Sequence, residues 1–323
     1  MESFKTKYGE ITGIVKHNLY ENGTLRDCTI GKANILKTKY GELIPQYDYV
    51  DIRRKYIKSI SFFEDGTLQR ISLNTQTRIS TSLGPIYAEL ITFYPNENIN
   101  RIFPLNGQLS AYWDEDQEFA LSKKIPLTFP FGDLEVISTG IYFYDNGNVK
   151  GISLWPEERL EINTPIGKQS VRLGFSLYEN GDIKAFEPSS PLSVPTPIGN
   201  IVAFDSNNYT FFKEMKSVNF TETGSLECIL TSKNKIQVID STIKKTHFFE
   251  PKYYDDLGNG EYYIYPLKIA FKDDFVYFDD INKFSINECT FSIGDFNLPD
   301  APKCTSDCST CMSSCSSGSI SII

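Results

Sequence analysis

Four of the seven cysteines lie close together near the end of the chain, at Cys304, Cys308, Cys311 and Cys315. Their spacing reads C-x3-C-x2-C-x3-C. Four thiolates within reach of one ion suit tetrahedral zinc, Cu(I) or an iron–sulfur cluster, because soft metals prefer sulfur ligands. The spacing therefore predicts a metal or cluster site at these residues, with zinc or an iron–sulfur cluster as the expected cofactor.

Other interpretations of the four cysteines stay open. Their spacing is close to the bacterial ferredoxin run C-x2-C-x2-C-x3-C, in which the fourth cysteine serves a second cluster. It also contains C-x3-C-x2-C, the triplet of radical S-adenosylmethionine enzymes, but that triplet belongs near the start of an α/β barrel. The remaining alternatives are two disulfides, free thiols, or a peptide rich in Ser, Thr and Cys that enzymes dehydrate and cyclise.

A second group of polar side chains follows an aromatic residue in the middle of the chain: Trp113, Asp114, Glu115, Asp116 and Glu118. Paired carboxylates can act as general acid and base, as in glycosidases, or bind a hard cation. Consecutive acids without the glycine spacing of an EF-hand are more typical of a solvated loop. We expect the insertion 114–127 to form a helical turn or a protruding loop, without an active site.

The remaining candidates for catalysis are isolated from one another in the sequence. His17 and His247 are the only histidines, and Cys28, Cys228 and Cys289 lie singly in strand-like segments. No G-x-S-x-G elbow and no phosphate-binding glycine motif is present. We therefore expect these residues to pack inside the fold, and we predict no catalytic residue.

The elements that must position these groups are repeated hairpins. The tip Tyr-Glu-Asn-Gly recurs with variations at Leu19 to Arg26, Phe62 to Arg70, Phe93 to Arg101, Phe143 to Lys150, Leu177 to Lys184 and Phe220 to Glu227, and Glu97 replaces the glycine in the third copy. Asn-Gly and Asp-Gly flanked by alternating apolar residues predict two-residue type I′ turns. The period of two predicts that Ile60, Phe62, Leu68 and Ile71 share a buried face.

A second element, Thr-x-x-Gly, alternates with the hairpins. Its glycines are Gly9, Gly41, Gly84, Gly132, Gly167 and Gly199, with Phe replacing Thr in the copy at Gly132, so the steps run from 32 to 48 residues. This period is typical of repeat proteins, in which stacked units bury a continuous core. PLNGQLSAYW, Pro104 to Trp113, has the pattern of one further hairpin with Asn106-Gly107 as its turn.

The Tyr-Glu-Asn-Gly-x-aliphatic-basic unit resembles the MORN-variant repeats of bacterial proteins, over about residues 9–230. In that family, tandem β-hairpins with the same tip stack side by side into an extended sheet. The resemblance implies a scaffold or binding module and carries no catalytic residues with it. The family pattern has nothing that matches the four terminal cysteines.

Charge and hydropathy restrict the partners. The formal net charge is −9, and the basic residues cluster only at Arg53-Arg54-Lys55 and Lys244-Lys245, so a nucleic-acid partner is not expected. The N-terminus lacks the apolar region of a signal peptide, and no run reaches the roughly 18 to 20 apolar residues of a membrane span. These features predict a soluble, cytoplasmic protein without a membrane span.

Together the patterns predict an all-β protein in three parts: an elongated array of stacked hairpins, as a single-layer or solenoid-like sheet, over residues 1–205, a β-rich terminal segment or cap over 206–300, and a flexible Cys- and Ser-rich tail over 301–323. We expect a non-enzymatic binding or scaffold protein with a protein partner, to which the tail delivers a metal or cluster. The alternative is a redox protein, or an accessory subunit of an enzyme, that carries an iron–sulfur cluster at the tail.

Overall fold

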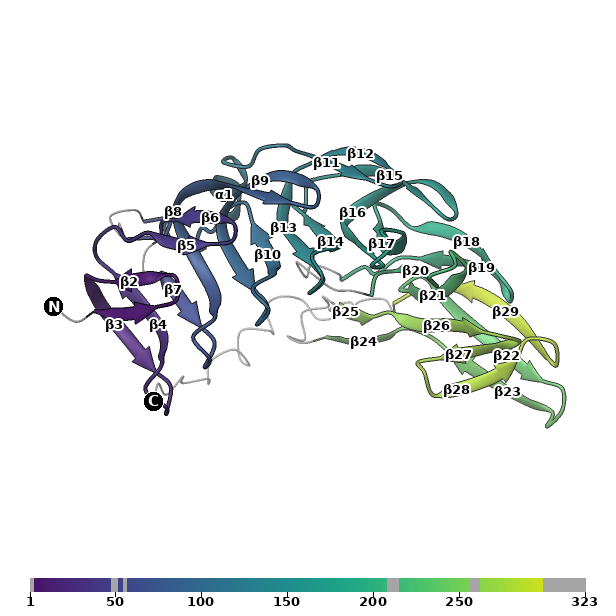
Figure 1. Cartoon of the computed structure of the whole chain (residues 1–323). Helices are drawn as coiled ribbons and strands as arrows, with labels where there is room; N and C mark the ends of the chain where they lie inside the picture. Colours follow the sequence, from purple (N-terminus) through teal and green to yellow (C-terminus); the bar gives the residue numbers. More distant parts are fainter. Residues whose placement is uncertain (1–2, 48–51, 55–56, 208–214, 256–261, 299–323) are drawn as a thin grey trace, which may run out of the picture.

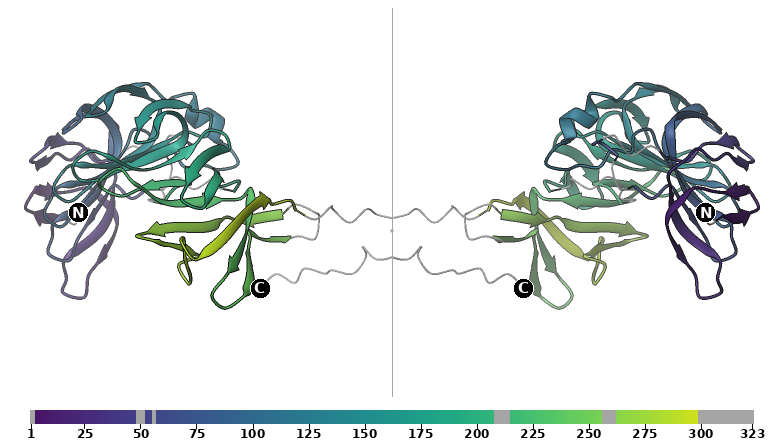
Figure 2. Two further views of the ribbon diagram at one scale, coloured as in Figure 1. Left: turned by 90° about the vertical axis from the view of Figure 1, so that its right-hand side faces the viewer. Right: turned by 90° about the vertical axis from the view of Figure 1, so that its left-hand side faces the viewer.

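The computed structural model describes residues 3–47, 52–54, 57–207, 215–255 and 262–298 (Figures 1 and 2). Over these residues the protein is nearly all β, with a single short helix, α1 (Glu115–Phe119). The predicted class is confirmed, because many hairpin strands join into one large antiparallel sheet. This sheet follows an arched, elongated molecule, with the N-terminal strands at one end and the C-terminal strands at the other (Figure 1).

The large sheet is antiparallel throughout and takes its strands mostly in chain order. From the N-terminal end they are β3 (Ile14–Leu19), β4 (Leu25–Ile30), β7 (Ile60–Phe62), β8 (Leu68–Thr81), β9 (Gly84–Phe93), β10 (Ile99–Phe103), β13 (Ser138–Phe143), β14 (Val149–Leu154), β16 (Gly167–Leu177), β17 (Ile183–Pro188), β20 (Val218–Phe220), β21 (Leu226–Thr231), β26 (Leu267–Lys272), β27 (Phe275–Phe278) and β28 (Asn282–Ser285), with β15 (Leu160–Thr164) paired to β16.

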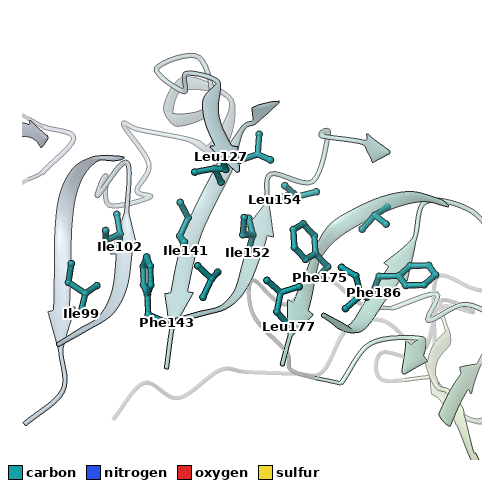
Figure 3. Close-up of a cluster of buried hydrophobic side chains, with 14 of the residues drawn as sticks. Ile99, Ile102, Leu127, Ile141, Phe143, Ile152, Leu154, Phe175, Leu177 and Phe186 are labelled. Carbon is teal, nitrogen blue, oxygen red and sulfur yellow. The ribbon is translucent and has the colours of Figure 1, made fainter. Parts of the chain in front are cut away.

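Alternation along each strand sends apolar side chains to one shared face. Ile60, Phe62, Leu68 and Ile71 are all buried, as predicted. In the centre of the array, inward side chains of neighbouring strands belong to one continuous buried cluster (Figure 3). A lone hairpin would leave this face in water, so the strands are stable only as a stack.

The tip of each main hairpin is a three-residue loop, and the predicted two-residue type I′ turn is wrong. At the first tip, Tyr20 N–H donates to Thr24 O (2.8 Å) and Gly23 N–H donates to Tyr20 O (3.0 Å). Only the glycine of this loop has positive φ (82°). This is a type I turn closed by a left-handed glycine, and the Asn22 side chain accepts from Thr24 N–H (2.9 Å). The asparagine therefore contributes to the loop through its side-chain oxygen, which accepts this hydrogen bond.

The third tip keeps the same loop without glycine. Glu97 takes the left-handed conformation at φ 66°, which costs free energy for a residue with a Cβ. Its carboxylate accepts a hydrogen bond from Tyr8 Oη (2.7 Å) and pairs with Lys7 Nζ (2.9 Å). The side chain thus forms a contact between distant units that glycine lacks, which offsets part of the backbone strain.

The tip tyrosines join successive hairpins. Each donates its hydroxyl to a backbone carbonyl at the end of a strand in the next hairpin: Tyr20 to Phe62 O (2.9 Å), Tyr94 to Phe143 O (2.9 Å), Tyr144 to Leu177 O (2.8 Å) and Tyr178 to Phe220 O (2.7 Å). The second tip has Phe63 at this position, which cannot donate. The repeated tyrosine is therefore a contact between units.

The Thr-x-x-Gly elements are short hairpins of their own. They are β1 (Phe4–Thr6) with β2 (Gly9–Ile11), β5 (Leu36–Thr38) with β6 (Gly41–Leu43), the far ends of β8 and β9, β11 (Ile125–Phe129) with β12 (Gly132–Val136), β15 with the start of β16, and β18 (Leu192–Thr196) with β19 (Gly199–Ala203). In the five copies with Thr, its hydroxyl donates to the glycine carbonyl, as from Thr6 to Gly9 O (2.8 Å).

The first five short hairpins each contact the tip of the main hairpin one unit further along. In the first, Tyr8 Oη accepts from Leu68 N–H (2.9 Å) at the second tip, and in the second, Tyr40 Oη accepts from Ile99 N–H (3.1 Å) at the third. The same offset continues along the array through Ser82 Oγ to Gly147 O (3.0 Å), Pro130 against Gly181 and Pro165 against Gly224. The units are therefore interlocked, and the short hairpins add a second layer to the array.

The segment after residue 205 extends the large sheet and adds a second one. Strands β20, β21, β26, β27 and β28 continue the main sheet without a break. Alongside them lie a three-stranded sheet and a two-stranded ribbon: β23 (Lys245–Phe249), β22 (Asn234–Asp240) and β29 (Cys289–Asp295), and β24 (Lys252–Asp255) with β25 (Tyr262–Tyr265). The turn expected at Gly258-Asn259-Gly260 lies outside the described residues.

The tyrosine contacts predict opposite effects of two substitutions. Phe63→Tyr places a hydroxyl where the other tips donate to the next unit, near Phe93 O, and should raise the free energy of unfolding by about 0.5–1.5 kcal/mol. Tyr144→Phe removes the bond to Leu177 O and should lower it by a similar amount. Urea denaturation followed by circular dichroism measures both. Equal stability of all three proteins would contradict the proposed role of the hydroxyl.

Candidate functional site

The four cysteines predicted to bind metal, Cys304, Cys308, Cys311 and Cys315, lie outside the described residues. The metal site at the tail therefore stays a prediction. Within the described residues, no three His, Cys, Asp or Glu side chains gather in a way that could hold a metal ion.

Of the isolated histidines and cysteines, Cys28 and Cys228 are buried as expected, whereas His17, His247 and Cys289 are only half-buried. The His17 ring lies 5.2 Å from that of Phe4, and the His247 ring lies 5.0 Å from that of Phe284. Cys28 and Cys228 are buried in β4 and β21, and burial raises the pKa of each thiol to about 12. Both thiols are therefore protonated near neutral pH, so neither is a nucleophile in this state.

The acidic insertion forms the expected helical turn, α1. Asp114 caps it, because its carboxylate accepts from Gln117 N–H (2.8 Å) and the Gln117 side chain accepts from Asp114 N–H (2.9 Å). The hairpin predicted with Asn106-Gly107 as its turn is wrong, since neither residue lies in a strand or turn there and the short bridge joins Ser110 to Trp113. The segment before α1 instead curves back to bring backbone N–H groups to buried carboxylates.

Arg53 binds two buried glutamates from distant parts of the chain. Its guanidinium donates to Glu118 through Nε (2.6 Å) and Nη2 (2.7 Å), and to Glu89 through Nη1 (3.1 Å) and Nη2 (2.8 Å). All three residues are at most 7% exposed. Both pairs have the fork-to-fork geometry that makes arginine–carboxylate contacts strong and directional.

Further donors complete the binding of Glu118. Trp113 Nε1–H (2.7 Å) and Gly107 N–H (2.8 Å) donate to its carboxylate. A Cβ on Gly107 would lie 2.1 Å from Glu118 Oε2, so this glycine allows a close approach of backbone to carboxylate. Burial alone would raise the pKa of Glu118, but the hydrogen bonds from Arg53 and Trp113 outweigh burial and hold the pKa below its ordinary value. Glu118 is thus ionised in the folded protein.

The network occupies a break in the ladder between β8 and β9. Pairing stops at Ser72 with Leu90 and resumes at Thr77 with Ala88, so β8 bulges out opposite Glu89. Arg54 lies in this bulge and donates to Leu73 O (2.7 Å), a carbonyl in the interrupted stretch. The bulge exposes backbone carbonyls, and Arg54 donates to two of them, those of Leu73 and Asn74. The same basic segment brings Arg53 to the glutamates.

A third buried glutamate lies beside a second bulge. Two extra residues, Leu173 and Gly174, interrupt the pairing of β16 with β17, and Leu173 has φ 58°. Next to them Glu187 is fully buried, accepts from Ser217 Oγ (2.8 Å) and lies 3.6 Å from Arg172. Burial raises the pKa of Glu187 above its ordinary value, opposite to the shift at Glu118. The hydrogen-bonding and ionic partners thus outweigh burial at Glu118 but not at Glu187.

Two cavities flank the insertion and share Leu105 and Ser138. The first, of about 190 Å³, is lined by Phe103, Leu105, Gly107, Leu109, Glu115, Glu118, Ser138, Thr139, Tyr142 and Trp155. The second, of about 560 Å³, is lined by Gln76, Pro85, Tyr87, Pro104, Leu105, Ser122, Lys123, Lys124, Ile125, Pro126 and Ser138. The insertion therefore creates concave surface on an otherwise regular array.

Sequence reasoning missed this site, because Arg53 and Glu118 are 65 residues apart. The available signal was the coincidence of two insertions of opposite charge, one basic at 52–58 and one acidic at 114–118. Complementary insertions into the same array can meet in space, whereas each alone is typical of a solvated loop.

In comparisons with known proteins, no family model, no curated protein and no solved structure matches the chain. The only helix among the described residues is α1, far shorter than the roughly 20 residues that a membrane-spanning helix requires.

The Glu118 network predicts a pH-dependent contribution to stability. Glu118→Gln keeps the shape of the side chain but removes its charge, and should lower the free energy of unfolding at pH 7 by about 2–3 kcal/mol. Because the folded pKa lies below the unfolded value of about 4.3, this stabilisation is present above that value and is lost as the pH falls through the folded pKa. The gap between wild type and variant should therefore narrow in acid.

Urea denaturation followed by tryptophan fluorescence, from about pH 7 down to about pH 3, measures this gap. Asp116→Asn removes an exposed carboxylate from the same helix and serves as the matched control, with no change expected. A constant gap at every pH would show that the charge of Glu118 does not stabilise the fold.

Proposed function

We propose that the protein is a non-enzymatic binding or scaffold protein that presents a tyrosine-rich surface to a protein partner. The observation that supports this most directly is the two-stranded ribbon β24–β25. Tyr254, Tyr263 and Tyr265 lie on one face of it, each between 41% and 50% exposed. We call this surface the tyrosine face.

The three rings of the tyrosine face contact one another. Tyr254 lies opposite Tyr263 in the ladder with ring centroids 5.5 Å apart, and Tyr265 lies 5.6 Å from Tyr254 and 5.1 Å from Tyr263. Mutual contact restricts the rings before any partner arrives, so little conformational freedom is left to lose on binding. Tyrosine is also enriched in protein interfaces, because it offers an apolar ring together with a hydroxyl that forms hydrogen bonds.

The other face of the ribbon packs onto the molecule. Ile264 is buried there, and the Tyr253 ring, which is itself 41% exposed, lies 6.0 Å from that of Phe296. Ile264 and Phe296 therefore anchor this face, and Tyr254, Tyr263 and Tyr265 lie on the opposite face. Figure 1 shows the ribbon extending from the C-terminal strands beneath the arch. An anchored aromatic surface on a rigid array is what a scaffold needs to hold a partner in one orientation.

The proposal also covers the four terminal cysteines. Cys304, Cys308, Cys311 and Cys315 lie outside the described residues, and their spacing supports a metal or iron–sulfur cluster that the tail delivers to the partner. The redox alternative remains an outcome of the metal assay.

The tyrosine face predicts a loss of partner binding on substitution. Affinity capture from the native host should recover a partner with the wild-type chain and lose at least about 90% of it with Tyr254→Ser/Tyr263→Ser/Tyr265→Ser, because a few aromatic residues dominate interface energies. Tyr112→Ser removes a tyrosine that is 79% exposed elsewhere and should capture the same amount as wild type. Failure to recover any partner, or equal recovery with the triple variant, would rule out the tyrosine face as the docking surface.

The cysteine tail predicts bound metal in protein purified without oxygen. Elemental analysis for zinc, copper and iron, with an acid-labile sulfide assay, should find about one zinc or one cluster per chain in wild type. The variant with Cys304, Cys308, Cys311 and Cys315 each replaced by Ser should contain none. Iron with sulfide and visible absorbance would favour the redox alternative, and absence of metal from both proteins would end the metal hypothesis.

A further inference from the structure

The smaller of the two cavities at the insertion has walls that are mainly aromatic and aliphatic. Phe103, Tyr142 and Trp155 line it together with Leu105 and Leu109, and its volume is about 190 Å³. This is more than ten times the roughly 10–15 Å³ that one water molecule needs. The cavity therefore has room for a small organic group of several heavy atoms.

Trp155 has a feature that packing alone does not explain. Its side chain is 6% exposed, yet its Nε1–H has no hydrogen-bond partner among the described residues. A buried donor without a partner costs free energy, so Phe or Leu would fill a purely structural position at lower cost. The indole must therefore contribute something other than packing, and indole has the most electron-rich ring that a side chain can offer to a cation.

One carboxylate at the cavity has no partner among the described side chains. Glu118, which also lines the cavity, is by contrast paired with Arg53, and Glu89 beside it is paired with Arg53 as well. Glu115 also lines the cavity, and none of the described side chains forms an ion pair or hydrogen bond with its carboxylate. It is only partly buried, so it lies where the cavity meets solvent. The cavity thus combines an aromatic wall with an available anion.

The aromatic residues of this protein already attract cations. The Arg101 guanidinium carbon lies 5.3 Å from the centroid of the Tyr142 ring, one of the rings that line the cavity. At the tips, Lys150 lies 5.5 Å from the Tyr144 ring and Lys184 lies 5.6 Å from the Tyr178 ring. A cation in the cavity would use the same attraction to the ring quadrupole, strengthened by exclusion of water.

The polar groups of the cavity select among cations. The Ser138 hydroxyl donates to Ser153 O (2.8 Å) and accepts from Gly140 N–H (3.0 Å), so it is occupied by the backbone. A primary ammonium could donate to the Glu115 carboxylate, but its remaining N–H groups would face mainly aromatic and aliphatic walls and would lose their hydrogen bonds to water. A methylated ammonium has few or no N–H groups to satisfy and presents methyl groups to the rings. The walls therefore favour methylated cations.

We propose that this cavity is a binding site for a small organic cation with a methylated ammonium head group, held by the Phe103, Tyr142 and Trp155 rings and by the Glu115 carboxylate. The site is separate from the tyrosine face and from the cysteine tail, so it goes beyond the function proposed above and does not rest on it.

The only two tryptophans of the chain are both at this site, which gives a direct measurement. Trp155 lines the cavity and Trp113 donates to Glu118, so intrinsic fluorescence reports on binding here alone. Titration of the full chain with tetramethylammonium chloride, at constant total chloride, should give a saturable change in emission. The neutral molecule of the same shape as tetramethylammonium is neopentane, and 2,2-dimethylpropan-1-ol is its soluble analogue. Because this alcohol carries no charge, it should bind at least about fivefold more weakly than tetramethylammonium.

Two matched variants locate the charge. Glu115→Gln should weaken tetramethylammonium binding at least about fivefold, because it removes the negative charge of Glu115 without changing the size of the side chain. Asp116→Asn removes the neighbouring acid of the same helix, which does not line the cavity, and should change the affinity less than twofold. Isothermal titration calorimetry checks each affinity independently of fluorescence.

Three results would overturn the proposal: no saturable binding by either method, equal affinity for the cation and the neutral alcohol, or equal affinity of wild type and Glu115→Gln. Because Glu115 is only partly buried, its variant should fold as wild type does, and circular dichroism verifies the fold. Because the ligand, the residues and the readout differ from those of the partner-capture and metal assays, failure here leaves those proposals untouched, and the reverse also holds.

Discussion

Each main hairpin of the array has one apolar face that it cannot bury by itself, and this constraint governs the rest of the structure. A short hairpin from the preceding unit contacts its tip, as Tyr8 and Tyr40 do, while the tip tyrosines bond to the following unit. Stability is therefore shared between neighbours. The connections between these contacts vary in length, which explains how a repeat with steps between 32 and 48 residues still forms one continuous sheet.

The same constraint accounts for the buried charges. Where a long strand passes from the main sheet into a short hairpin, its ladder breaks, as at Ser72 to Thr77 in β8 and at Leu173-Gly174 in β16. A break leaves backbone groups without ladder partners in a region closed to water. Arg54 donates to carbonyls in the first break, and Glu89 and Glu187 lie beside the two breaks, where they accept from N–H groups of segments that pack there, those of Asn106 and Ser217 respectively. Arginines then balance the carboxylates, so the ionic networks are a consequence of how the two layers are joined.

A strand with alternating side chains has only two faces, and its apolar face must pack on the core. Local patterns in the sequence were therefore sufficient to predict the fold class and the buried faces. They were insufficient for the turns. Asn-Gly is compatible with a type I′ turn and with a three-residue loop closed by glycine, and the choice depends on side-chain bonds such as Asn22 to Thr24 N–H. Gly107 was interpreted as a turn residue for the same reason, although its position is set by contact with Glu118.

The candidate site lay beyond such reasoning, because the charges of Arg53 and Glu118 are each typical of exposed loops until the fold brings them together. Residues of the repeat itself are committed to internal contacts: the tip tyrosines to carbonyls and the Thr-x-x-Gly threonines to their own turns. Surfaces free to bind must then come from segments that the interlocking does not use. The ribbon β24–β25 is one such segment, with three exposed tyrosines. The insertion around Trp113 is another, and it encloses a cavity together with Phe103, Tyr142 and Trp155 of the array. Because the residues of the regular repeat make contacts within the fold, surfaces for binding are expected where the repeat is interrupted.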